Sequence, residues 1–135
     1  MRKTCAALLA AAAGLMCASS ALAHHSFAMF DQTRQVTLKG TVKEFQWTNP
    51  HAWIEVEIQN AQGQTELWGV ELNSPNNLIR QGWKRDVMKP GDKVTVLINP
   101  LKDGTKGGLF NAVWLADGKL LGDPKPVGPI NVQAP

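Results

Sequence analysis

The stretch VTLKGTVKEFQWTNPHAWIEVEIQ, residues 36–59, decides the fold class of this chain. Its first half, Val36–Trp47, is apolar at alternate positions, and the phase of this alternation shifts after Gly40. A glycine inside a strand commonly marks a bulge or a sharp bend. The pattern therefore predicts one long strand that bends enough to serve both halves of a barrel.

Further strands and one short helix follow. Apolar alternation between turn signals predicts four more strands, around residues 52–59, 65–72, 94–98 and 109–116. Between the third and fourth strands, Ser74 and Pro75 have the residue types of an N-cap and a first helical position, and Gly82 is typical of a helix end. We expect this helix to make its apolar contacts through Leu78 and Ile79.

The order of these elements is three strands, a short helix and two strands. It is the order of a small five-stranded Greek-key barrel, the OB-fold. We therefore expect an all-β domain with one short helix over residues 36–121, after a lead-in at 24–35 and before a proline-rich extended tail at 122–135. The alternative is an open β-sandwich, which normally needs about seven strands.

The first 23 residues have the three parts of a secretory signal peptide. Arg2 and Lys3 are positive, the run Ala6–Met16 is apolar, and Ala21–Ala23 has the small-x-small pattern of a cleavage site. The apolar run is shorter than the ~20 residues that span a bilayer. We expect a mature protein that begins at His24, has no transmembrane segment, and resides in the periplasm or is secreted.

Processing changes the composition that matters. Both cysteines, Cys5 and Cys17, leave with the signal peptide, which excludes disulfides, zinc ribbons and cysteine nucleophiles in the mature domain. Arg2 and Lys3 leave as well, so that 12 of the 14 basic residues remain against 11 acidic ones. This nearly neutral charge balance predicts no generally basic surface, and we therefore expect no nucleic-acid partner.

The mature domain has three histidines, His24, His25 and His51, and two of them stand at its predicted start. A free α-amine has a pKa of ~7.7–8.0, so that an N-terminal histidine offers an amine and an imidazole as a ready chelate. A second imidazole would complete a nitrogen-rich set that suits Cu(II). We expect His24 with His51, and His25 as a further candidate, to bind copper. The alternative is a solvated histidine tail and a His51 that only hydrogen-bonds within its turn.

A metal-free binding module is the rival hypothesis. The loops after strands one and four flank the usual ligand face of an OB-fold. Asn49, Lys102 and Lys106 lie in those loops, and Trp53 lies on the polar face of its strand. These four residues predict a site for a small envelope ligand, such as a saccharide or peptide, or contact with an envelope protein partner. No nucleophile elbow, phosphate loop or metalloprotease motif is present, which argues against an enzyme.

Several segments together resemble an uncharacterised family of short exported bacterial proteins. These segments are AHHSFAMFD (23–31), GTVKEFQWTNPHAWIEVE (40–57), SPNNLIRQGWKRD (74–86), KPGDKVTV (89–96) and NPLKDGTKGG (99–108). The family has an HHS mature N-terminus and an NPHAW-like segment, and all three histidines fall in those two places. The resemblance implies a periplasmic or secreted location and assigns no activity.

Overall fold

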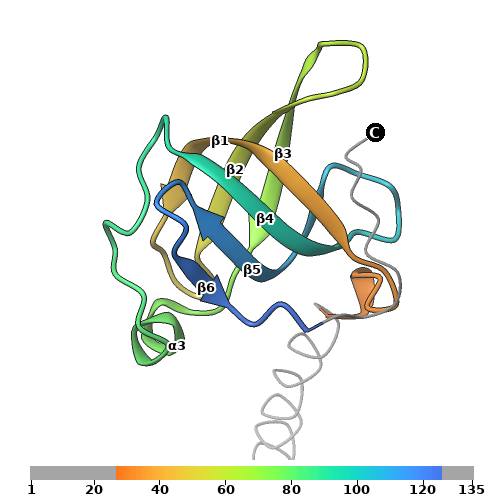
Figure 1. Cartoon of the computed structure of the whole chain (residues 1–135). Coiled ribbons are helices and arrows are strands. Elements are labelled where there is room, and N and C mark those ends of the chain that lie inside the picture. The colour runs from red at the N-terminus through yellow and green to blue at the C-terminus, as the bar shows by residue number, and fades with distance from the viewer. Residues whose placement is uncertain (1–26, 126–135) are drawn as a thin grey trace, which may run out of the picture.

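The computed structural model describes residues 27–125 (Figure 1). One 3-10 turn, six strands and one α-helix make up this part of the chain: η1 (Phe27–Met29), β1 (Val36–Gln46), β2 (Trp53–Gln59), β3 (Thr65–Glu71), α3 (Pro75–Arg80), β4 (Lys93–Pro100), β5 (Gly107–Leu115) and β6 (Leu120–Gly122).

The strands form a closed barrel. Their order is β3-β2-β1-β4-β5-β6, and an additional parallel pairing of β3 with β5 joins the two ends of the five-stranded part. That closing pair runs from Gly69 beside Gly107 to Glu71 beside Leu109. With α3 between β3 and β4, this is the predicted OB-fold, and the closure excludes the open sandwich.

The long first strand serves both halves of the barrel, as predicted. It pairs with β4 over Val36–Thr41 and with β2 over Thr41–Gln46. At the changeover, a Cβ on Gly40 would lie 2.2 Å from the Glu57 carbonyl oxygen and 2.9 Å from Ile58 Cγ2. The two strands cross so closely here that only glycine fits between them.

The phase shift of the alternation has its own cause. The register between β1 and β2 slips between Val42 and Glu44, which marks a β-bulge there and turns Phe45 towards the core. Inward residues of every strand of the barrel are buried, as the pattern predicts; they include Leu38, Val42, Ile54, Val56, Ile58, Trp68, Val70, Val94, Val96, Ile98 and Val113.

The short helix begins and ends as expected, with one correction. Ser74 caps it by accepting a hydrogen bond from the Asn77 backbone N–H at 3.4 Å, and Gly82 follows it with φ of +84°. Leu78 is buried against the core, but the prediction for Ile79 is wrong, because its side chain is 57% exposed. Successive residues point about 100° apart on a helix, so six residues present only one face to the barrel.

The residues after the fifth strand pack on the barrel. β6 pairs with β5, and the Asp123 backbone N–H then donates to the Asn111 carbonyl at 2.9 Å. The buried Gln35 donates from Nε2 to the Lys125 carbonyl at 2.9 Å. The first four residues of the expected tail, 122–125, are thus held by backbone hydrogen bonds, whereas 126–135 lie outside the described residues.

No helix within residues 27–125 is long and apolar enough to cross a membrane. The predicted signal peptide, with cleavage before His24, lies outside the described residues and stays a prediction.

The crossing at Gly40 yields a test of the fold. Gly40→Ala should lower the free energy of unfolding by about 2 kcal/mol or more, because its Cβ overlaps the β2 backbone rather than a movable side chain. Gly69→Ala is the matched control, since a Cβ there meets nothing within 4 Å, and we expect a change within about 0.5 kcal/mol. Urea denaturation of both variants measures this, and equal losses would contradict the close crossing.

Candidate functional site

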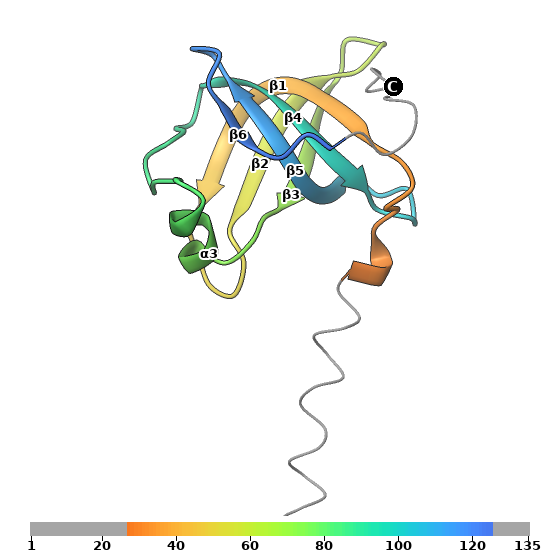
Figure 2. The ribbon, with the colours of Figure 1, turned by 60° about the horizontal axis from the view of Figure 1, so that its bottom comes forward.

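A pocket of about 680 Å³ opens beside α3. Its wall comes from seven places: η1, the residue before β1, the loop after β1, the end of β3 with the residues after it, α3 and its C-cap, the first half of β5, and the end of β6 with the residues after it. Figure 2 shows this side of the barrel, with α3 at one edge and η1 at the other. Segments that are far apart in the sequence therefore meet at one cavity, which is the usual setting of a ligand site.

His51 is positioned at this pocket by the end of the β1–β2 loop. Next to it, the Ala52 backbone N–H donates to the Asn73 carbonyl at 3.1 Å, and the Ala52 carbonyl accepts from Leu72 at 2.9 Å. The Thr48 hydroxyl donates to the His51 carbonyl at 3.1 Å. These bonds hold the loop against the end of β3, where the last residue of the strand is Glu71.

Glu71 is the partner of this histidine. Its Oε1 pairs with His51 Nδ1, and the residue is only 8% exposed. Its second oxygen, Oε2, has no hydrogen-bond partner within the described residues. A buried carboxylate normally needs a partner, and a carboxylate on one imidazole nitrogen leaves the other nitrogen for a ligand.

Sequence reasoning missed Glu71. It stands on the polar side of an alternating strand, where a solvated residue is the ordinary expectation. Its burial follows from the pairing of Glu71 with Trp53 across β2 and β3 and from the closing pair with β5. Only the register of these non-local pairs places it beside His51, so no local signal could have found it.

The other two predicted metal ligands, His24 and His25, lie outside the described residues. Within residues 27–125, no three His, Cys, Asp or Glu side chains gather as a metal site. Phe27, however, lines the same pocket as His51.

The expected ligand face divides into two places. Asn49 is exposed in the turn after β1, and Trp53, 37% exposed, begins β2. Lys102 and Lys106 lie in the loop between β4 and β5, where the Lys102 backbone N–H donates to the Met29 carbonyl at 2.9 Å. No hydrogen bond or ion pair described for residues 27–125 joins the first pair to the second.

Lys106 has a structural partner at the closing seam. Its Nζ lies 2.8 Å from Glu66 Oε2 and 5.8 Å from the centre of the Trp68 ring. The hydrogen bond from Lys106 is the largest cause that holds the pKa of Glu66 below its ordinary value, and a hydrogen bond from Asn60 adds to it. Lys106 thereby links β3 to the loop that leads into β5.

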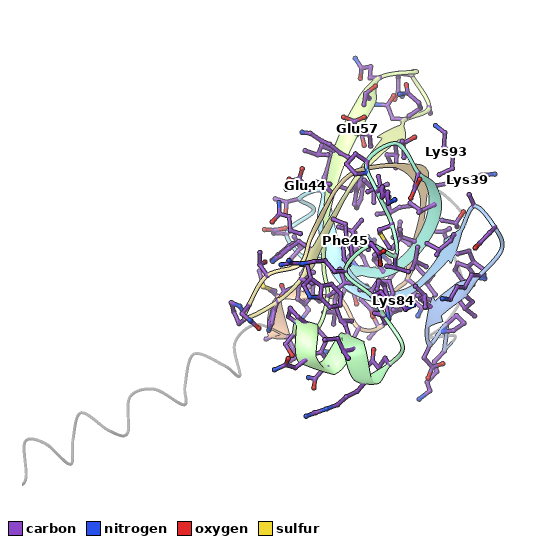
Figure 3. All side chains as sticks on the ribbon, turned by 90° about the vertical axis from the view of Figure 1, so that its left-hand side faces the viewer. Lys39, Glu44, Phe45, Glu57, Lys84 and Lys93 are labelled. Atoms are coloured by element: carbon purple, nitrogen blue, oxygen red, sulfur yellow. The ribbon has the colours of Figure 1, made fainter. Side chains whose placement is uncertain are left out.

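An aromatic row leads from the loop after β1 to the pocket. Phe45, labelled in Figure 3, packs its ring centre 5.6 Å from that of Trp47 and 6.2 Å from that of Trp83. Trp83 in turn packs edge-on against Phe110 at 5.3 Å, and Phe110 lines the pocket. The buried Trp83 is therefore one ring removed from the cavity, which makes it a natural fluorescence reporter of the site.

The fold and this pocket define an OB-fold protein with a His–Glu pair at one cavity. The chain belongs to DUF6152, a family of unknown function that matches residues 12–111, which confirms the resemblance to an uncharacterised family. The structure is similar to that of the mitochondrial single-stranded DNA binding protein Rim1 of S. cerevisiae, with a TM-score of 0.45 and 14% identity over 64% of this chain and 95% of that one. No curated protein matches the sequence.

The seam contact can be tested by titration. Lys106→Met should raise the pKa of Glu66 towards its ordinary value of 4.5, because the largest cause of its lowering is removed. A carboxylate whose pKa is lowered by folding stabilises the protein at pH values above its ordinary pKa, and this stabilisation is lost as the pH falls through the pKa of the folded state. Because the variant has less of this stabilisation, its free energy of unfolding should fall less on acidification than that of the wild type. Lys102→Met is the control. An NMR titration in which both variants behave alike would contradict the contact.

Proposed function

We propose that the processed protein is a small periplasmic or secreted binding protein that takes up one Cu(II) ion. The donors are the α-amine and imidazole of His24 together with the His51 imidazole, and His25 is a further candidate donor. One observation carries the proposal: the buried Glu71 holds His51 at Nδ1, in a pocket whose wall also includes Phe27. The role would be capture or delivery of the ion rather than turnover of a substrate.

The partner of His51 supports a metal at the other nitrogen. Histidines that bind metals usually donate their second ring N–H to a carboxylate or a carbonyl, which fixes the ring orientation and makes the ligating nitrogen more basic. Glu71 stands in that relation to His51, and Nε2 has no hydrogen-bond partner within the described residues. The residue pair thus fits an ion that binds at Nε2.

The chain path supports a contribution from the N-terminus. Cleavage before His24 would leave an α-amine three residues along the chain from Phe27, and Phe27 lines the pocket. An α-amine titrates near pH ~7.7–8.0 and is available to a metal at neutral pH. The described residues supply too few ligands alone, so the N-terminal chelate would complete the site.

The types of donor favour copper over other ions. The predicted mature chain has no cysteine, which removes thiolate ligands, and two imidazoles with an amine form a nitrogen-rich set. Such a set follows the preference of Cu(II) among the divalent first-row ions. The carboxylate of Glu71 adds a negative charge close to the bound cation.

A Cu(II) titration of periplasmically processed protein tests the proposal, after mass spectrometry of its first residue. We expect one equivalent to bind and to quench tryptophan fluorescence, with affinity about tenfold or more weaker in His51→Ala and lost when one residue precedes His24. Glu57→Gln, at the distant end of β2 (Figure 3), is the control that should leave binding unchanged. Binding indifferent to both changes at the site would contradict the proposal and direct attention to the barrel face that carries Trp53.

Glu71 yields a separate prediction for the same titration. Glu71→Gln keeps an acceptor beside His51 Nδ1 but removes the charge, so we expect the Cu(II) affinity to fall about tenfold. An unchanged affinity with an unchanged thermal melt would show that Glu71 has no part in metal binding.

A further inference from the structure

The hydrogen-bond network around the pocket leaves three acceptor atoms on its lining residues without a partner within residues 27–125. Asn99 donates from Nδ2 to the carbonyls of Asp31 at 3.2 Å and Arg34 at 2.7 Å, which fixes the orientation of its amide. Its Oδ1 must then accept, and it does so from Asn111 Nδ2 at 2.9 Å. The orientation of Asn111 is therefore fixed as well, and its Oδ1 has no partner within the described residues.

The His51–Glu71 pair supplies the other two acceptors. An ionised carboxylate only accepts hydrogen bonds, so the Nδ1 paired with it carries the proton, and in the neutral imidazole Nε2 then presents a lone pair. The second oxygen of Glu71, Oε2, is also without a partner within residues 27–125. His51, Glu71 and Asn111 all line the pocket, so Nε2, Oε2 and the Asn111 Oδ1 are its candidate acceptors.

The rest of the lining combines an apolar wall, the neutral amides Gln35, Asn73 and Gln81, and one pair of opposite charges. Phe110 and three leucines, Leu72, Leu78 and Leu109, form an apolar wall. At the rim, Asp123 is paired with Lys125 at 3.1 Å, so these two charges offset each other. Beside this wall lies the buried carboxylate of Glu71, whose negative charge, with a neutral His51, disfavours anions and favours a cation.

We propose that this pocket binds a small organic amine, a primary ammonium group on an aliphatic or aromatic body. An ammonium has three donors and no acceptor, which matches three acceptors, and its charge complements Glu71. The apolar wall receives the body, and a cavity of about 680 Å³ has the size of a small-molecule site. This inference concerns the metal-free protein and does not depend on copper binding.

Titration with 2-phenylethylamine, in the presence of a chelator, tests the inference. The matched ligand is 3-phenylpropionate, which has a similar body and the opposite charge. Chemical shifts of the Asn111 side-chain amide report binding at the pocket. We expect the amine to bind about tenfold or more tightly than the acid. Equal affinity of the two ligands, or shifts confined to other faces, would overturn the inference.

Two variants decide the role of charge. Glu71→Gln should weaken amine binding about tenfold or more, while Glu57→Gln leaves it unchanged. Asn73→Asp should strengthen it several-fold, because it adds a carboxylate to the pocket lining and keeps the oxygen that accepts from Ser74 and Asn77 at 2.8 Å each. If Glu71→Gln does not fold, the amine affinity of Asn73→Asp still tests the inference. An affinity no higher than that of the wild type would contradict it. Loss of copper binding with retained amine binding would reject only the copper proposal.

Discussion

The close crossing of β1 and β2 at Gly40 is the constraint on which the barrel depends. The Glu57 carbonyl occupies the space that a side chain on Gly40 would need. At this point β1 leaves β4 and continues beside β2, so that one strand belongs to both halves of the sheet. A straight strand would leave two open edges, and the bend instead brings β3 and β5 to each other, where their pairing removes both edges.

The closing pair also builds the pocket. Gly69 meets Gly107 across the seam, and Gly108 lies so close to β4 that its Cβ would be 2.6 Å from the Asn99 carbonyl oxygen. The glycines of β5, Gly107 and Gly108, thus let the backbones approach, and the seam ends at Glu71. A residue on the polar side of a strand becomes buried there, because the neighbouring loop and the start of β5 cover it. Closure and site therefore have the same origin in the register of this seam.

The sequence carried enough information to predict the elements but too little to predict the site. Alternation, caps and turn residues are local signals, and they predicted the succession of strands and helix along the chain and the polar strand face on which Trp53 lies. The third strand of the β4–β5–β6 meander, Leu120–Gly122, is too short to show any alternation. His51 was predicted from its residue type and its position in a turn. Its partner Glu71 was not, since their proximity depends on a pairing twenty residues apart that no local pattern encodes.

One buried carboxylate underlies both proposals for the pocket. Glu71 fixes the proton on Nδ1 of His51 and thereby determines that Nε2 is an acceptor, and it also sets the negative potential that a cation meets. A metal ion and an ammonium group differ in what they need next: the metal needs further lone pairs, which the N-terminal chelate would supply, and the ammonium needs acceptors, which Asn111 and Glu71 supply. Nε2 has one lone pair, so a copper ion and an ammonium group cannot both bind it at the same time. The two proposals therefore describe alternative ligands of the same negatively charged site.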